Sequence, residues 1–83
     1  MSKIIMGIQL IQRQEIAKEV QDILTKYGCI IKTRLGVHQA SEDSCSEAGL
    51  IILEFLDGAN NQVHKMEEEL NKIGNITVKK MEF

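Results

Sequence analysis

The largest group of side chains with potential chemistry lies between residues 36 and 50, in the segment GVHQASEDSCSEAGL. His38 offers an imidazole and Cys45 a thiol, and zinc and similar divalent metals accept both as ligands. The segment also carries three carboxylates that could supply harder oxygen ligands, namely Glu42, Asp43 and Glu47. The spacing of His38 and Cys45 matches no closed zinc motif, so a second copy of the chain would have to complete four ligands. The expected metal ligands are therefore His38 and Cys45, with the carboxylates as helpers or supplied across an interface.

The same segment has two other interpretations. Residues 38–48 can form a solvated hairpin loop between two strands, longer than the usual connection of about 2–5 residues. Long polar loops on rigid strands often carry binding function, so this loop could equally contact a protein partner. Alternatively, His38 could act as a base for the Cys45 thiol, but no third group is marked to orient the histidine. The solvated loop is the simplest of these interpretations. We expect no enzyme, and the sequence identifies no cofactor.

Outside this segment the candidate residues are few. Cys29 begins a predicted strand and is expected to be buried or half-buried, whereas His64 lies beside Val63, off the apolar stripe of a predicted helix, and is expected to be solvated. The chain has no Cys-x-x-Cys pair and no glycine-rich phosphate loop. These absences argue against a copper carrier and against the common nucleotide-binding motifs.

Charge and composition narrow the class of partner. The chain has 83 residues, a net charge of −2 and a pI near 5.6. A nucleic-acid-binding module this short needs a basic stripe to neutralise phosphates, so we expect no direct nucleic-acid binding. No apolar run approaches the ~20 residues of a membrane-spanning helix, so no membrane association is expected. The first residues are expected to form a strand rather than a signal peptide. With only two cysteines, a cytoplasmic location is expected.

Hydrophobic periodicity predicts four strands and two helices. The runs KIIMGIQLI, CIIKTRLGVH, GLIILEFL and NITVKKMEF are expected as strands over residues 3–11, 29–38, 49–56 and 75–83. Helical stripes are expected over 12–27 and 62–73, each followed by a glycine. In the second strand, alternation places Ile31, Thr33, Leu35 and Val37 on one face, which suits an edge strand.

An internal repeat supports this order of elements. KYGCI at 26–30 matches KIGNI at 72–76, an offset of 46 residues (72 minus 26). The offset pairs Val20 with Met66 and Leu24 with Leu70 in the helices, and Ile5 with Ile51 in the strands. A doubled β-α-β unit predicts the α+β ferredoxin-like sandwich, with a four-stranded antiparallel sheet and two helices on one face. Residues 1–83 are expected to form a single domain.

The first and third strands have apolar residues at both odd and even positions, so both of their faces are apolar. Two helices, however, can cover only one face of the sheet. The uncovered face would expose a larger apolar patch than monomers usually tolerate. We therefore expect a homo-oligomer, a dimer or a tetramer, that buries this face. Ile51 or Leu53, whichever faces outward, is expected to contribute to the contact.

Three segments carry a resemblance to a known family, namely YGCIIKTRLGV, GLIILEFLDG and LNKIGNITVKKM. Over nearly its whole length the chain resembles the small ACT-like proteins described as candidate regulators of the iron-only hydrogenase system. These are distantly similar to the C-terminal domain of the nickel-responsive repressor, which is ACT-like and tetrameric and binds metal between subunits. The resemblance implies an ACT-like, transcription-related regulator that is oligomeric, open to control by a small ligand or a metal, and active through a partner.

The chain differs from these relatives where ligand or DNA would bind. It lacks the ribbon-helix-helix of the repressor and has no His-x-His pair on a strand. Its first strand ends in IQRQE, without the Gly or Pro that lets the backbone of amino-acid-binding ACT domains approach a ligand. A purely structural oligomerisation domain without a ligand is therefore the alternative function.

Overall fold

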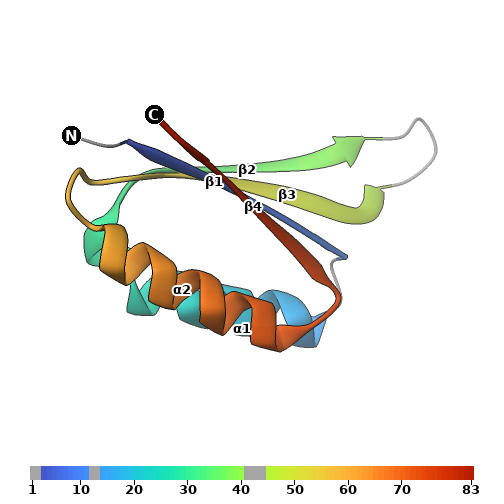
Figure 1. The fold of residues 1–83 in the computed structure, drawn as a ribbon. Helices are drawn as coiled ribbons and strands as arrows, with labels where there is room; N and C mark the ends of the chain where they lie inside the picture. The colour runs from blue at the N-terminus through green and yellow to red at the C-terminus, as the bar shows by residue number, and fades with distance from the viewer. Residues whose placement is uncertain (1–2, 12–13, 41–44) are drawn as a thin grey trace.

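The computed structural model describes the backbone of residues 3–11, 14–40 and 45–83, and the side chains of these except 11, 14, 37–40 and 45–48. The elements are β1 (Ile4–Ile11), α1 (Gln14–Lys26), the 3₁₀ turn η1 (Gly28–Ile30), β2 (Ile31–Ala40), β3 (Cys45–Phe55), α2 (Asn60–Ile73) and β4 (Ile76–Glu82). The strands form one antiparallel sheet in the order β2-β3-β1-β4, and both helices lie on one side of it (Figure 1). This architecture confirms the predicted ferredoxin-like α+β sandwich.

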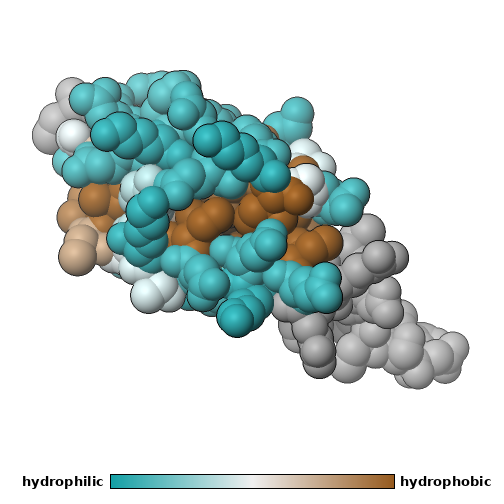
Figure 2. Space-filling view, turned by 90° about the horizontal axis from the view of Figure 1, so that it is seen from below, coloured by the Kyte–Doolittle hydropathy of each residue, from teal (hydrophilic) through white to brown (hydrophobic). Residues whose placement is uncertain are grey.

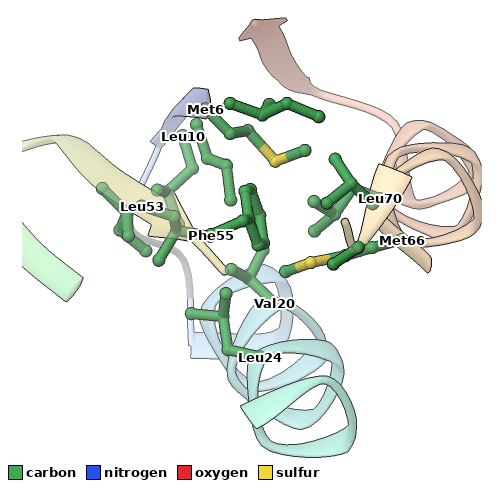
Figure 3. Close-up of a cluster of buried hydrophobic side chains, with 13 residues drawn as sticks. Met6, Leu10, Val20, Leu24, Leu53, Phe55, Met66 and Leu70 are labelled. Atoms are coloured by element: carbon green, nitrogen blue, oxygen red, sulfur yellow. The ribbon is translucent and has the colours of Figure 1, made fainter. Parts of the chain in front are cut away.

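The core lies between the sheet and the two helices. Every second residue of β1 from Ile4 to Leu10 is buried, and so are Ile51, Leu53 and Phe55 of β3. These side chains meet Val20 and Leu24 of α1 and Met66 and Leu70 of α2 (Figure 3). Because strand side chains alternate between faces, the intervening residues of β1 and β3 point to the other side of the sheet.

The helices form where the apolar stripes predict them. The buried residues of α2, Val63, Met66 and Leu70, lie three and four residues apart and so share one face of the helix. The helix ends at Gly74, which has a positive φ of 78°, a conformation that glycine adopts without steric cost. Neither helix in the described part of the chain is long and apolar enough to cross a membrane.

The outer surface of the helix layer is largely polar. Figure 2 looks onto this layer and shows hydrophilic residues over most of it, with a hydrophobic strip between them. Partly buried residues of the helices, including Ile16, Ile23 and Ile73, pack against the core. The helix layer is therefore the side of the molecule best suited to water.

A bulge in β2 corrects the predicted face of this edge strand. Ile31 pairs with Phe55 and Thr33 pairs with Glu54, so two residues of β2 oppose one of β3. Ile31 consequently packs against the core, whereas Thr33 and Leu35 lie on the side away from the helices. The expectation that Ile31 shares a face with Thr33 was wrong, because a bulge shifts the alternation by one residue.

The β2–β3 connection is shorter than predicted. β2 continues to Ala40 and β3 begins at Cys45, and these two residues pair. The last described pair between β1 and β3 is Ile11 with Ala48, so among the described residues the start of β3 pairs with β2 alone. Residues 38–40 and 45–48 therefore belong to strands rather than to a loop.

The two halves of the chain match in their helices but not in the faces of their strands. Val20 and Met66 are both buried, as the offset of 46 residues predicts. The same offset pairs Leu10, which is 4% exposed, with Leu56, which is 47% exposed. When the two halves are aligned on their helices, the buried positions of β3 are therefore shifted by one residue relative to the buried positions of β1.

Candidate functional site

The face of the sheet away from the helices, here called the open face, is defined by the register of the strands. Paired residues of an antiparallel sheet point to the same side. One row across the sheet is therefore Leu35, Ile52, Gly7 and Lys79, and the next is Thr33, Glu54, Ile5 and Met81. Leu50, Gln9 and Thr77 continue the face toward the other end. The expectation that Ile51 or Leu53 faces outward was wrong, since these residues are 8% and 0% exposed against the helices.

Exposed apolar side chains gather on this open face. Among the described residues, the exposed large apolar ones are Leu35, Leu50, Leu56, Met81 and Phe83. Leu35, Leu50 and Met81 lie on the open face itself, and Leu35 and Met81 are more than half exposed, at 54% and 57%. Leu56 and Phe83 follow the ends of β3 and β4, and the Phe83 amide donates to the Lys3 carbonyl. Among the described residues, the open face therefore carries most of the exposed large apolar side chains.

A hollow of about 260 Å³ lies in the middle of the open face. Gly7 has no side chain there, and the residues around it on this face are Ile5, Leu50, Ile52, Lys79 and Met81. All of these except Lys79 are apolar. The hollow can therefore take an apolar group with little desolvation cost.

One carboxylate stands at the edge of the apolar patch and is held by neighbouring groups. Thr33 Oγ1 donates a hydrogen bond of 2.9 Å to Glu54 Oε1. Lys3 Nζ and Lys32 Nζ lie 3.3 Å and 4.0 Å from Glu54 Oε2. The pKa of Glu54 lies below its ordinary value, first because of the hydrogen bond from Thr33 and then because of Lys3. The carboxylate therefore stays ionised near neutral pH and its charge is balanced locally.

The two adjacent lysines of β4 lie on different faces of the sheet. Lys80 pairs with Met6 on the helix side, and its Nζ lies 3.1 Å from Glu67 Oε1 of α2. Lys79 pairs with Gly7 on the open face and makes no ion pair within the described part of the chain. Lys79 is therefore the one positive charge beside the hollow that no described carboxylate neutralises.

A second polar cluster links the two helices. Glu69 of α2 accepts hydrogen bonds from Lys26 Nζ at 2.7 Å and from the Tyr27 hydroxyl. The hydrogen bond from Lys26 and then that from Tyr27 lower the pKa of Glu69. The Lys26 ammonium also lies 5.4 Å from the centre of the Tyr27 ring. This cluster ties the end of α1 to α2.

The predicted metal ligands fall in the hairpin of β2 and β3. His38 pairs with Gly49, and Cys45 pairs with Ala40, so the backbone brings His38 and Cys45 to the same end of this ladder. Glu47 also lies in β3, while Glu42 and Asp43 lie outside the described residues. Among the side chains that the structure describes, no three His, Cys, Asp or Glu residues are arranged to hold a metal.

The two other candidates identified from the sequence have different outcomes. His64 is solvated as predicted, with 66% of its side chain exposed, and its Nε2 lies 3.0 Å from Glu68 Oε1. Cys29 is exposed, contrary to expectation, because it lies within η1 and not in β2.

Sequence reasoning missed Gly7 and Leu35 as site residues. Gly7 interrupts the apolar run of β1, and Leu35 lies on a strand that was predicted to be an edge. The glycine within a central strand is the one local signal, because such a glycine often marks a close approach of another group. That Leu35 lies at the same level follows from the strand register.

Comparison with protein families identifies a relationship over most of the chain. Residues 3–80 match the family described as "TM1266-like: Iron-only hydrogenase system regulator, putative". The chain belongs to this family. The TM1266-like assignment agrees with the resemblance found in the sequence, and no curated protein is close enough in sequence to count as a relative.

Solved structures share the fold of this TM1266-like chain. The uncharacterized protein TM1266 from Thermotoga maritima superposes with a TM-score of 0.76 at 16% identity, over 100% of this chain and 99% of that one. The ACT domain of the GTP pyrophosphokinase of Chlorobium tepidum gives 0.65 at 12% identity, over 95% and 96%. The nitrogen regulatory PII-like protein CPII of Thiomonas intermedia K12, bound to ADP, AMP and bicarbonate, gives 0.63 at 13% identity, over 100% and 93%. At these identities the comparisons establish an ACT- and PII-like fold.

Proposed function

We propose that this chain regulates an iron-only hydrogenase system at the level of transcription, as a homo-oligomer that acts through a protein partner. The observation that carries the proposal is the family match over residues 3–80. One solved structure of the same fold carries a regulatory name, a nitrogen regulatory PII-like protein, and another is the ACT domain of a GTP pyrophosphokinase. In this proposal residues 1–83 form one ACT-like domain that works in the cytoplasm.

The open face supports the oligomer. Leu35, Leu50 and Met81 are exposed on it, in contrast to the largely polar helix layer. Monomeric proteins seldom expose contiguous apolar patches of more than a few hundred Å². A second copy that covers the open face would remove this surface from water.

A partner rather than DNA itself fits the charge of the chain. The net charge is −2, and four of the lysines in the described part, including Lys3, Lys26 and Lys80, lie within 4.0 Å of carboxylates. Phosphate binding draws on lysines and arginines that are free to replace counterions. We therefore propose regulation through protein contact and without catalysis.

The experiment that tests the regulatory proposal is deletion of the gene in its native host. Iron-only hydrogenase transcripts and hydrogenase activity are then measured with and without restored expression of the chain. We expect transcript levels to change and restoration to reverse the change. Unchanged transcripts together with unchanged activity would remove the proposal, whereas altered activity at constant transcript would move the regulation to a later step.

A metal is the effector that we propose, with His38 and Cys45 as ligands and Glu42, Asp43 or Glu47 as helpers. Support comes from the backbone register, which brings His38 and Cys45 to one end of the β2–β3 hairpin. The test is a titration with Co(II) or Ni(II), followed by thiolate charge-transfer absorption, on the wild type and on His38→Ala and Cys45→Ser. Equal and weak binding by all three proteins would exclude this metal site.

The alternative is an oligomerisation domain without any effector. Ligands that bind the native state raise its stability by about 2.7 kcal/mol at a hundredfold excess over the dissociation constant. Thermal melts with Ni, Zn, Fe and amino acids therefore separate the two functions. A shift with any of them favours the regulator with an effector, and the absence of every shift favours the structural domain.

A further inference from the structure

Gly7 leaves a gap in the open face at its centre. It lies in the inner strand β1, between Ile52 of β3 and Lys79 of β4. A Cβ atom at position 7 would meet one described atom within 4 Å, Leu50 Cδ1 at 3.8 Å. Glycine in the interior of a strand costs stability and often marks a place where another group approaches closely. The position therefore has room for a group from outside the chain.

The size of the hollow limits what that group can be. Its volume of about 260 Å³ lies below the ~300–1,000 Å³ of typical small-molecule pockets. Apolar cavities of about 150 Å³ are large enough to hold benzene, so the hollow can take an aliphatic side chain. Its apolar lining of Ile5, Leu50, Ile52 and Met81 favours the same kind of occupant.

Among the side chains that the structure describes, Leu35 is the exposed large apolar one on the open face that does not line the hollow. It lies on the edge strand β2, opposite Ile52, and is 54% exposed. Gly7 lies opposite Ile52 from the other side, on β1. Leu35 and Gly7 are thus each one strand, about 4.8 Å, from Ile52 in the same row of the sheet.

This placement makes the open face complementary to itself. Two copies can pack face to face about a two-fold axis that lies between the sheets, parallel to β3 and above Ile52. This axis places Leu35 of each copy opposite Gly7 of the other copy. In such an isologous contact every pair of contacting residues occurs twice. The axis also brings the two Glu54 side chains near each other, and each is already balanced by its own Lys3 and Lys32.

Resting on the proposed oligomer, we propose that Leu35 of a second copy of the chain inserts into the hollow at Gly7, and that Leu35 of the first copy inserts reciprocally. With β3 on the axis, β2, β3 and β1 of one copy lie over β1, β3 and β2 of the other, and β4 lies outside the contact. Three strands spaced about 4.8 Å apart, with about eight residues each rising ~3.3 Å, give a footprint of roughly 380 Å² per copy. The two faces together bury about 760 Å², which is the size of a weak, reversible interface.

The test is a double-mutant cycle on the dissociation constant of the dimer, measured by analytical ultracentrifugation. Gly7→Leu fills the hollow, and Leu35→Ala removes the inserted side chain, so each change should weaken the dimer by at least about tenfold. The double variant should dimerise more tightly than Gly7→Leu alone, because removal of Leu35 relieves the clash with the new leucine. Residues in contact show such non-additivity, whereas separated residues do not.

Gly36→Leu is the matched control. Gly36 lies on β2 opposite Ile51, on the helix side of the sheet, and a Cβ there meets nothing within 4 Å. This variant should leave the dimer unchanged. Circular dichroism checks folding, and Gly7→Ala replaces Gly7→Leu if the leucine prevents folding, since its Cβ makes only ordinary contact with Leu50.

The outcomes separate this inference from the proposed oligomer. A wild-type chain that is monomeric at high micromolar concentration would refute the oligomer and the insertion together. A stable wild-type dimer that tolerates Gly7→Leu, or whose double variant shows simply additive losses, would refute the insertion of Leu35 and leave the oligomer standing.

Discussion

Two adjacent isoleucines of β3 allow one substitution to be compared on the two faces of the sheet. Ile51 is 8% exposed and belongs to the core, whereas Ile52 is half-buried on the open face. Ile51→Lys would place an ammonium group in the core, which has no buried polar or charged residue among those described. Ile52→Lys would place the same group on a face that water reaches in the single chain. The first variant should fail to fold, and the second should fold and fail to dimerise.

The expected magnitudes follow from burial. Removing a buried isoleucine side chain forfeits about 1.5–3 kcal/mol, and burying an unpaired charge adds several kcal/mol more. A chain of this length has about 4–12 kcal/mol of stability at ~0.05–0.15 kcal/mol per residue, so Ile51→Lys consumes most of it. Ile52 occurs twice in a dimer, so Ile52→Lys should cost about 3–6 kcal/mol of association, or roughly 10²–10⁴ in the dissociation constant.

The assay combines circular dichroism with sedimentation of the same samples. Ile52→Lys is expected to keep the far-ultraviolet spectrum of the wild type and to sediment as a monomer, and Ile51→Lys is expected to lose the spectrum. If Ile52→Lys unfolds as fully as Ile51→Lys, the assignment of faces from the register is wrong. If Ile52→Lys sediments as the wild-type oligomer does, the open face is not the interface.

Three further predictions concern stability and DNA. Leu24→Ala and Leu70→Ala truncate side chains that are 2% and 0% exposed. Each should lower the free energy of unfolding by about 2–5 kcal/mol in urea titrations, and a loss below about 1 kcal/mol would contradict their place in the core. The folded-state pKa of Glu69 is lowered from 4.5, so its contribution is present above pH ~4.5 and is lost as pH falls through the folded pKa. Urea midpoints of Glu69→Gln should therefore fall less steeply than those of the wild type between pH 6 and 3, and parallel curves would refute the linkage. Purified protein alone should give no salt-sensitive gel shift with hydrogenase promoter DNA, and a clear shift would overturn the proposal of a protein partner.

The elements of the fold were predictable because their patterns are local. The apolar stripe of α2 and the glycine that ends it can be found in the sequence, and the structure confirms both. The faces of β2 were not predictable, because the bulge between Ile31 and Thr33 depends on pairing with β3. Strand alternation has a period of two, so one extra residue reverses every later assignment.

The candidate site was predictable only in part. The apolar character of both faces of β1 and β3 indicated an uncovered apolar surface, which the register now places at Leu50 and Ile52. The hollow at Gly7 depends on which residues of three strands lie at the same level, and a single sequence does not contain that information. The polar composition of residues 38–48 favoured a loop, but β2 and β3 pair there beyond the end of β1, where no central strand requires apolar neighbours.

The phase difference between the two halves has a consequence for how such a chain can evolve by recombination. Ten residues separate the buried Leu10 from the buried Val20, and eleven separate Phe55 from Met66. Suppose that the two halves are aligned on their helices and exchange segments. If the crossover lies inside α1 and α2, the buried stripe of each helix stays continuous. If it lies inside β1 and β3, the residues after the crossover change faces, and the core residues of the strand move to the open face. The two halves of this chain should therefore be exchangeable through their helices, and an exchange through their strands should need a compensating insertion or deletion of one residue.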